Sequence, residues 1–121
     1  MAQIISQVIE QHAEEAAFLW LLRDDAVRAP HYTLGELAAL DQRVEAHLDG
    51  LRIAGEDGWK ATKDQLRWRE AGEIFAGTAL ALATPDPAPY EEMREVGTSE
   101  PELLRGFISA FGWTEYKNYI F

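Results

Sequence analysis

The sequence predicts an all-α fold for a chain of 121 residues. Apolar residues recur at steps of three and four along most of the chain, which is the period of an amphipathic helix. Thr33 and Glu36 have the spacing of a capping box, in which two side chains satisfy the free amides at a helix start. No segment sustains the apolar and polar alternation of a half-buried strand, so no sheet is predicted.

The first helix is predicted to run from about residue 2 to residue 27. Its apolar face consists of residues at three- and four-residue steps, namely Ile5, Val8, Ile9, His12, Ala16, Leu19 and Leu22. Arg23 suits the negative end of a helix, and Pro30 fits a stop shortly after it.

The second helix is predicted to begin at the Thr33 cap and to end near Asp49. Its apolar stripe consists of Leu37, Leu40, Val44, Leu48 and Leu51. Gly50 is the type of residue that commonly ends a helix, because glycine adopts a left-handed backbone without a steric penalty. We therefore expect the helix to end there.

Four shorter helices are predicted in the second half, over residues 59–68, 70–83, 90–96 and about 100–111. The proline-rich stretch 84–89 breaks the chain between the second and third of them. Ser99 and Glu102 have the spacing of another capping box, and Gly112 that of a helix end. Residues 114–121 are expected to form a terminal cap or a truncated further helix.

Charge and composition restrict the function more than any motif does. The net charge is −10, from 21 acidic and 11 basic residues. An acidic surface repels a phosphate backbone and anionic lipid, so we expect no nucleic-acid or membrane binding. It permits a basic protein partner, although many acidic surfaces serve only solubility. The absence of cysteine excludes disulfides and thiolate metal sites.

The expected organisation is a single cytoplasmic domain. The first residues lack the basic region of a secretory signal, and the longest apolar run, 16–22, is too short to cross a bilayer. We divide the chain into N-terminal helices (1–55), helix pairs (56–113) and the terminal segment (114–121).

The second half resembles a HEAT-type repeat. Asp86-Pro87 would open one helix, and the segment 99–112 would form the helix that packs against it. Residues 70–83 look like the inner helix of a preceding repeat. The resemblance implies antiparallel helix pairs in a short right-handed α-solenoid, in which each pair covers the apolar surface of the next.

Most of the chain also resembles a family of uncharacterised bacterial HEAT-repeat-like proteins that are often encoded in type VI secretion gene clusters. The segments that carry this resemblance are 10–20, 28–32, 44–51 and 109–113. Members of the family are usually longer, with more repeats. The resemblance provides no catalytic residues, and it implies a protein-binding scaffold or adaptor associated with type VI secretion.

No pattern in the sequence predicts catalysis. Phosphate-binding loops, nucleophile elbows and dinucleotide fingerprints are missing. His12 and Glu15 have the i, i+3 spacing of helical metal ligands, but one such pair needs further ligands. His12, His31 and His47 could converge on zinc or iron, although their spacing is not specific. We expect no enzyme, cofactor or metal, and a small metal-dependent enzyme stays an alternative.

Aromatic residues are the candidate contacts with another protein, because tryptophan and tyrosine anchor many interfaces as well as cores. The candidates are Trp20, Trp68, Trp113, Tyr116, Tyr119 and Phe121. The terminal aromatic residues either cap the last helix pair or leave an open face through which copies of the chain could associate. The partner would be a secretion component or, as an alternative, a toxic effector that an immunity-type protein neutralises.

Overall fold

The computed structural model describes the backbone of residues 2–120 and the side chains of residues 5–115. Every regular element in this part of the chain is helical, which confirms the predicted all-α class. The elements are α1 (Ala2–Ala26), α2 (Leu34–Ile53), α3 (Glu56–Gln65), the 3-10 turn η1 (Leu66–Trp68), α4 (Ala71–Leu82), α5 (Pro87–Gly97) and α6 (Pro101–Ile120). None of the described helices has the length and apolar character needed to cross a lipid bilayer.

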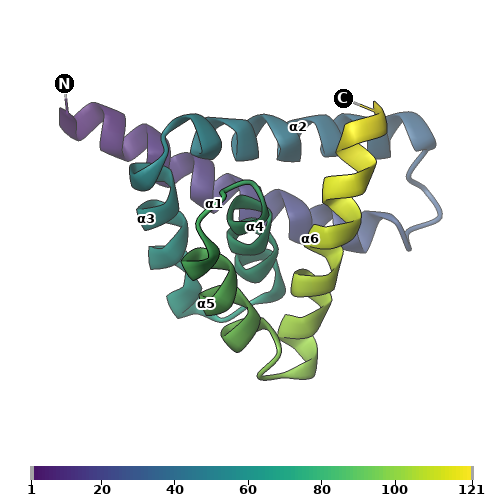
Figure 1. The fold of residues 1–121 in the computed structure, drawn as a ribbon. Helices are drawn as coiled ribbons and strands as arrows, with labels where there is room; N and C mark the ends of the chain where they lie inside the picture. The colour runs from purple at the N-terminus through teal and green to yellow at the C-terminus, as the bar shows by residue number, and fades with distance from the viewer. Residues whose placement is uncertain (1, 121) are drawn as a thin grey trace.

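The helices α1 and α2 lie side by side and run in opposite directions (Figure 1). The buried side of α2 includes the predicted residues Leu40, Val44, Leu48 and Leu51. Leu19 and Trp20 of α1 belong to the same hydrophobic cluster. The apolar periodicity of α2 therefore predicted how this helix packs. The predicted face of α1 is wrong at its start, where Ile5 and Val8 are exposed.

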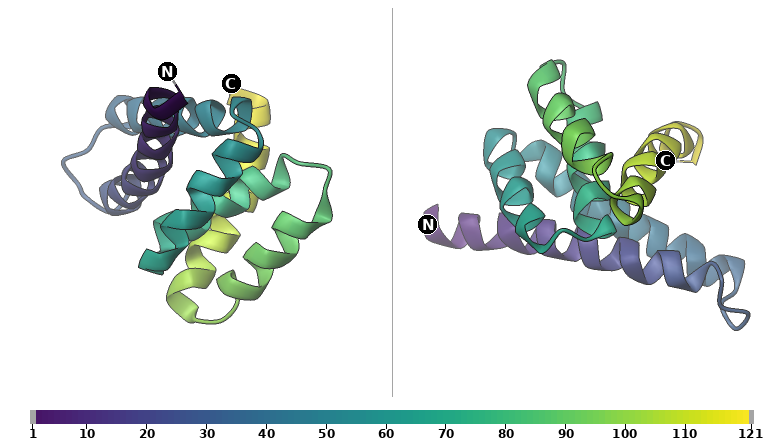
Figure 2. Two further views of the ribbon diagram at one scale, coloured as in Figure 1. Left: turned by 90° about the vertical axis from the view of Figure 1, so that its left-hand side faces the viewer. Right: turned by 90° about the horizontal axis from the view of Figure 1, so that it is seen from below.

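The helix α4 lies at the centre of the molecule and packs against α1, α3, α5 and α6 (Figures 1 and 2). Every residue from position 71 to position 81 is buried, so α4 has no solvent-facing side over this stretch. The ring of Phe75 stacks on Trp20 and meets Trp113 edge-on, with centroid distances of 5.5 and 5.7 Å. These three rings join α1, α4 and α6 in one core.

The close crossing of α4 and α6 depends on Gly106. A Cβ atom at this position would lie 2.1 Å from the carbonyl oxygen of Ala71, far inside van der Waals contact. Only glycine therefore lets the two backbones approach this closely, and the tight crossing brings the aromatic side chains of the core together.

Two predicted helix ends are wrong. The helix α2 continues past Gly50 to Ile53, and α6 continues past Gly112 to Ile120. Gly50 makes room for a neighbour, because a Cβ there would lie 2.8 Å from the imidazole of His12. A Cβ at Gly112 would have no described atom within 4 Å, so packing does not explain that glycine.

The helix starts agree with the capping signals in part. The Thr33 capping box is confirmed, with Thr33 Oγ1 accepting from the Glu36 amide and Glu36 Oε1 accepting from the Thr33 amide. The predicted Ser99 box does not form. Ser99 Oγ instead donates to the Val96 carbonyl at the end of α5, and the first turn of α6 closes on the carbonyl of Glu100.

Candidate functional site

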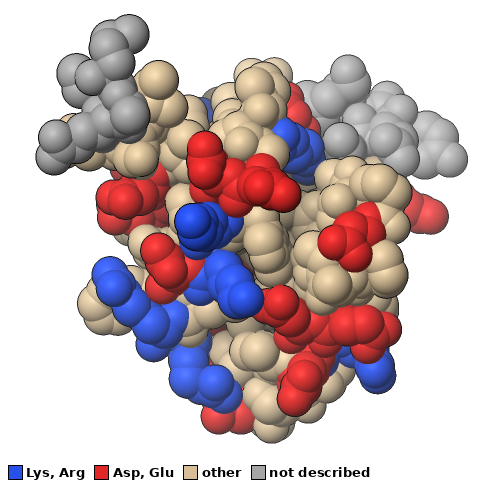
Figure 3. Space-filling view, turned by 60° about the vertical axis from the view of Figure 1, so that its left-hand side comes forward, with Lys and Arg blue, Asp and Glu red and all other residues tan. Residues whose placement is uncertain are grey.

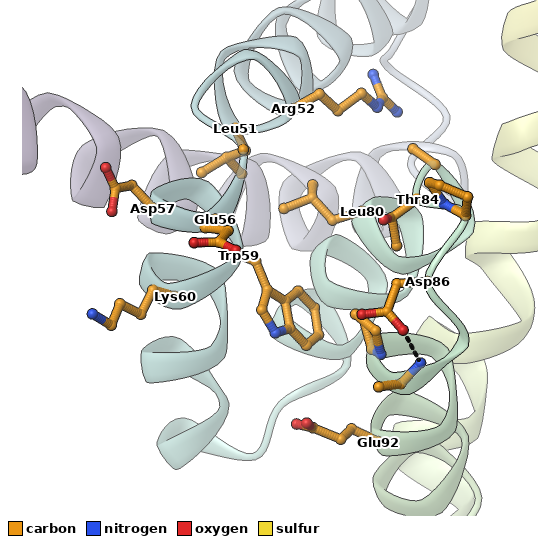
Figure 4. Close-up of a pocket in the computed structure, with 15 residues that line it drawn as sticks. Leu51, Arg52, Glu56, Asp57, Trp59, Lys60, Leu80, Thr84, Asp86 and Glu92 are labelled. Atoms are coloured by element: carbon orange, nitrogen blue, oxygen red, sulfur yellow. Dashed lines mark hydrogen bonds between the residues drawn. The ribbon is translucent and has the colours of Figure 1, made fainter.

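A groove of about 710 Å³ opens beside the C-terminal end of α4. The end of α2, the first half of α3, the α4–α5 connection and the start of α5 form its walls (Figure 4). Local sequence explains the opening. Gly55, with a φ of 61°, turns the chain sharply into α3, and Asp86 caps α5 by accepting a 3.1 Å hydrogen bond from the Ala88 amide. Both turns direct the chain around the groove.

The side chain of Trp59 lies in the groove between α3 and the start of α5 (Figure 4). Leu51, Leu80 and Pro89 line the groove with it, so its interior is largely apolar. Trp59 is half-buried and packs against both hydrophobic clusters of the described core. The fold therefore holds this ring in place while part of it faces the groove.

The indole N–H of Trp59 differs in its hydrogen bonding from those of the buried tryptophans. Trp20 Nε1 donates to Ser109 Oγ at 3.0 Å, and Trp113 Nε1 donates to Glu45 Oε1 at 2.8 Å. Trp59 Nε1 has no acceptor among the described residues, although the ring is half-buried. A ligand in the groove would therefore meet a positioned donor beside apolar surface, an arrangement typical of binding sites.

Most charged side chains that line the groove are acidic, namely Glu56, Asp57, Asp86 and Glu92, against Arg52 and Lys60. Arg52 is already neutralised, because its Nη1 lies 2.6 Å from Glu45 Oε2 and 2.7 Å from Asp49 Oδ1.

Glu92 of α5 is also paired, since its Oε2 lies 3.0 Å from Nζ of Lys63 in α3. Glu56, Asp57 and Asp86 form no ion pair with another described residue, and neither does Lys60. The unpaired charge at the groove is therefore mainly negative, which favours a cationic ligand.

The histidines do not converge on one point. His12 and His47 form a pair between α1 and α2, with their Nδ1 atoms 2.9 Å apart. His31 lies in the α1–α2 connection, where its ring contacts Tyr32 at a centroid distance of 4.9 Å. Among the described residues, no group of three histidine, aspartate or glutamate side chains is placed to hold a metal ion.

Two predicted partner contacts are wrong. Trp20 and Trp113 are only 2% and 4% exposed, so neither can anchor a partner on the surface. Trp68 is 58% exposed and remains a candidate.

The side chains of Tyr116, Tyr119 and Phe121 lie outside the described residues. Trp59 was not among the predicted contacts. In sequence it is only the first residue of the predicted helix 59–68, and the proline-rich segment was predicted only as a break.

The groove around Trp59 is thus the best-formed candidate site in the described part of the chain. Comparison of the sequence and the structure with protein-family models, curated proteins and solved structures found no match.

Proposed function

We propose that the chain is a protein-binding module that holds a short, extended segment of a partner protein in the groove around Trp59. The segment would carry an apolar residue next to a lysine or arginine. The observation that carries this proposal is the indole N–H of Trp59, which is positioned in an apolar groove and has no acceptor among the described residues.

Each part of the groove would recognise a different part of such a segment. The apolar side chain would cover the ring of Trp59 and the adjacent Leu80, and this contact would remove apolar surface from water. The indole would donate to a backbone carbonyl of the segment. An extended segment fits this role because its carbonyl groups are not used in a helix.

The basic side chain of the segment would pair with the carboxylates at the groove. Glu56 and Asp57 in the first turn of α3 and Asp86 at the start of α5 are the available acceptors. Long-range attraction to a chain of net charge −10 would speed the encounter, and the groove would select the sequence.

The wider role is a proposal that rests on the resemblance of segments 10–20, 28–32, 44–51 and 109–113. On that ground we propose a scaffold or adaptor with HEAT-like helix pairs, associated with type VI secretion. The acidic groove also supports the alternative of an immunity-type protein, since carboxylates at a groove could cover basic residues of a toxic effector.

Selection from a phage-displayed library of random 12-residue peptides tests the groove directly. We expect the selected peptides to share an apolar residue beside lysine or arginine. Trp59→Phe keeps an aromatic ring but removes the N–H, and it should weaken the dissociation constant of a selected peptide roughly five-fold, the effect of one lost hydrogen bond. Asp86→Asn should weaken the binding of basic peptides more than the binding of their uncharged variants.

Trp68→Phe is the matched control, because it makes the same change at an exposed tryptophan outside the groove. Circular dichroism should show that all variants stay folded. Unchanged affinity in Trp59→Phe, or selection of peptides without basic residues, would refute the proposal.

A further inference from the structure

A second feature of the surface is the exposed turn that follows α3. It consists of Arg67, Trp68 and Arg69, which we call the Arg67–Arg69 turn. Trp68 is 58% exposed, and the guanidinium of Arg67 lies over its ring, 5.2 Å from the centroid. Neither residue lines the groove around Trp59, so the turn is a separate surface.

The turn belongs to a basic region on an acidic chain. Residues 60–69 contain Lys60, Lys63, Arg67 and Arg69, which are four of the eleven basic residues of the sequence. With Asp64 as the one acidic residue among them, this stretch carries a charge of +3, which leaves −13 for all other residues. In the view of Figure 3, Lys and Arg side chains gather on the left of the visible face, and most Asp and Glu side chains lie above them or to the right.

Some of this positive charge is available for a ligand. Lys63 pairs with Glu92 at 3.0 Å, and Arg69 pairs with Glu100 at 3.2 Å. Lys60 and Arg67 form no ion pair with another described residue. Arg67 instead lies against the exposed ring of Trp68, an arrangement that leaves its donors open to a carboxylate.

The backbone of the turn takes a left-handed conformation at Arg69. Arg69 has a φ of 50°, and it is the one non-glycine residue with a positive φ among the described residues. Glycine would adopt this left-handed conformation without a steric penalty. Arg69 ends η1, where its amide donates to the Leu66 carbonyl, and its side chain pairs with Glu100, so the turn is tied to the α5–α6 connection.

We infer that the Arg67–Arg69 turn binds a short acidic segment of a second protein. Arg67 supplies the positive charge for its carboxylates, and an apolar or aromatic residue of the segment covers Trp68. This inference does not depend on the groove around Trp59, because Arg67, Trp68 and Arg69 do not line that groove.

The short distance over which exposed charges interact in salt solution favours a short acidic segment over a long polyanion as the ligand of the turn. Salt screens exposed charges beyond about 10 Å at 0.1 M ionic strength. A short acidic peptide on the turn therefore meets mainly the local positive charge. A nucleic acid or an anionic bilayer extends further and meets the repulsion of the remaining surface.

A labelled 10-residue peptide of aspartate and glutamate with one central phenylalanine is the probe. Its affinity for the full chain is measured by fluorescence anisotropy at several salt concentrations. We expect it to bind more tightly than a lysine-substituted peptide, a 12-nucleotide single strand or vesicles of phosphatidylcholine and phosphatidylserine. Binding should weaken as salt rises.

Arg67→Gln and Trp68→Ala should each weaken binding at least five-fold, and Trp68→Phe should retain most of it. Arg94→Gln, at an exposed arginine of α5 outside the region, and Trp59→Phe should leave it unchanged. Equal binding of acidic and basic peptides, insensitivity to Arg67→Gln, or tighter binding of the oligonucleotide or vesicles would each overturn the inference.

Discussion

The imidazole rings of His12 and His47 meet between α1 and α2 with their Nδ1 atoms 2.9 Å apart. One Nδ1 must donate and the other must accept, because two protonated nitrogens repel at this distance. At least one ring is therefore neutral whenever the contact is intact. The ring of His12 also lies against Gly50, which fixes the spacing of the two helices at this point.

The free energy of unfolding should depend on pH through His47. Burial lowers the pKa of His47 from its ordinary value of 6.5, and the nearby His12 and Arg43 lower it further, against the opposing effect of Glu15. The unfolded chain then binds more protons than the folded chain. The stabilisation is present above pH 6.5 and is lost as the pH falls below it.

Urea denaturation at pH 7.5 and pH 5 measures this dependence. The midpoint should be lower at pH 5, and His47→Gln should reduce the difference. His31→Gln is the control, because His31 is an exposed loop residue. An equal pH dependence in the native chain and His47→Gln would exclude His47 as the cause.

Replacing Glu73 should stabilise the fold at neutral pH. This side chain of α4 is buried, and its Oε2 has no hydrogen-bond partner among the described residues. Burial raises the pKa of the Glu73 carboxyl, with a smaller contribution from the charge of Glu70. The folded chain therefore favours the protonated form, and stability is lost as the pH rises through the raised pKa.

We expect Glu73→Gln to raise the free energy of unfolding by about 1 kcal/mol at pH 7.5 and to change it little at pH 4. Glu95→Gln is the control, because Glu95 is exposed on α5 and does not contribute to the pKa of Glu73. Thermal unfolding at both pH values provides the comparison, and a loss of stability in Glu73→Gln at pH 7.5 would contradict this explanation.

Two glycines of α6 should respond to alanine in opposite ways. A Cβ at Gly106 would lie 2.1 Å from the carbonyl oxygen of Ala71, and backbone atoms cannot move aside without separating α4 from α6. Gly106→Ala should therefore destabilise the fold by about 2 kcal/mol or more.

Gly112→Ala serves as the matched control, because its Cβ would have no described atom within 4 Å. It should leave stability unchanged or raise it by up to about 1 kcal/mol through the higher helix propensity of alanine. Guanidinium denaturation of the two variants provides the measurement. Equal changes in the free energy of unfolding would mean that α4 and α6 do not approach as closely at Gly106 as the structure shows.

Trp113 should contribute to stability rather than to binding. It is buried, donates to Glu45 at 2.8 Å and lies beneath the guanidinium of Arg23, 5.6 Å from the ring centroid. Trp113→Phe should lower the free energy of unfolding by about 1–3 kcal/mol, because a buried hydrogen bond and part of the ring are lost. Trp68→Phe should not change it, and calorimetry of both variants would reveal the difference.

The sequence predicted the helices and the core of α2 because both follow from local periodicity. It did not predict that Gly50 lies inside a helix, since that depends on the imidazole of His12, which is distant in the sequence. The predicted apolar stripe of α2 also left out Asp41 and Glu45. Both are buried because Arg23 and Arg52 pair with them, contacts that no periodicity encodes.

The candidate site was harder to predict than the fold. Trp20, Trp59 and Trp68 look alike in sequence, since each lies in a helical pattern. Their roles depend on neighbouring helices, which bury Trp20, leave part of Trp59 facing a groove and leave Trp68 exposed. The proline-rich segment 84–89 predicted a break, and only the fold places it opposite α3.

A crystal structure of the chain with a peptide selected from the phage library would show whether the groove around Trp59 is the binding site. We expect the peptide to lie extended between α3 and α5, with a backbone carbonyl within hydrogen-bonding distance of Trp59 Nε1 and a basic side chain near Asp86. A peptide seated on another surface, with the Trp59 groove left empty, would contradict this expectation.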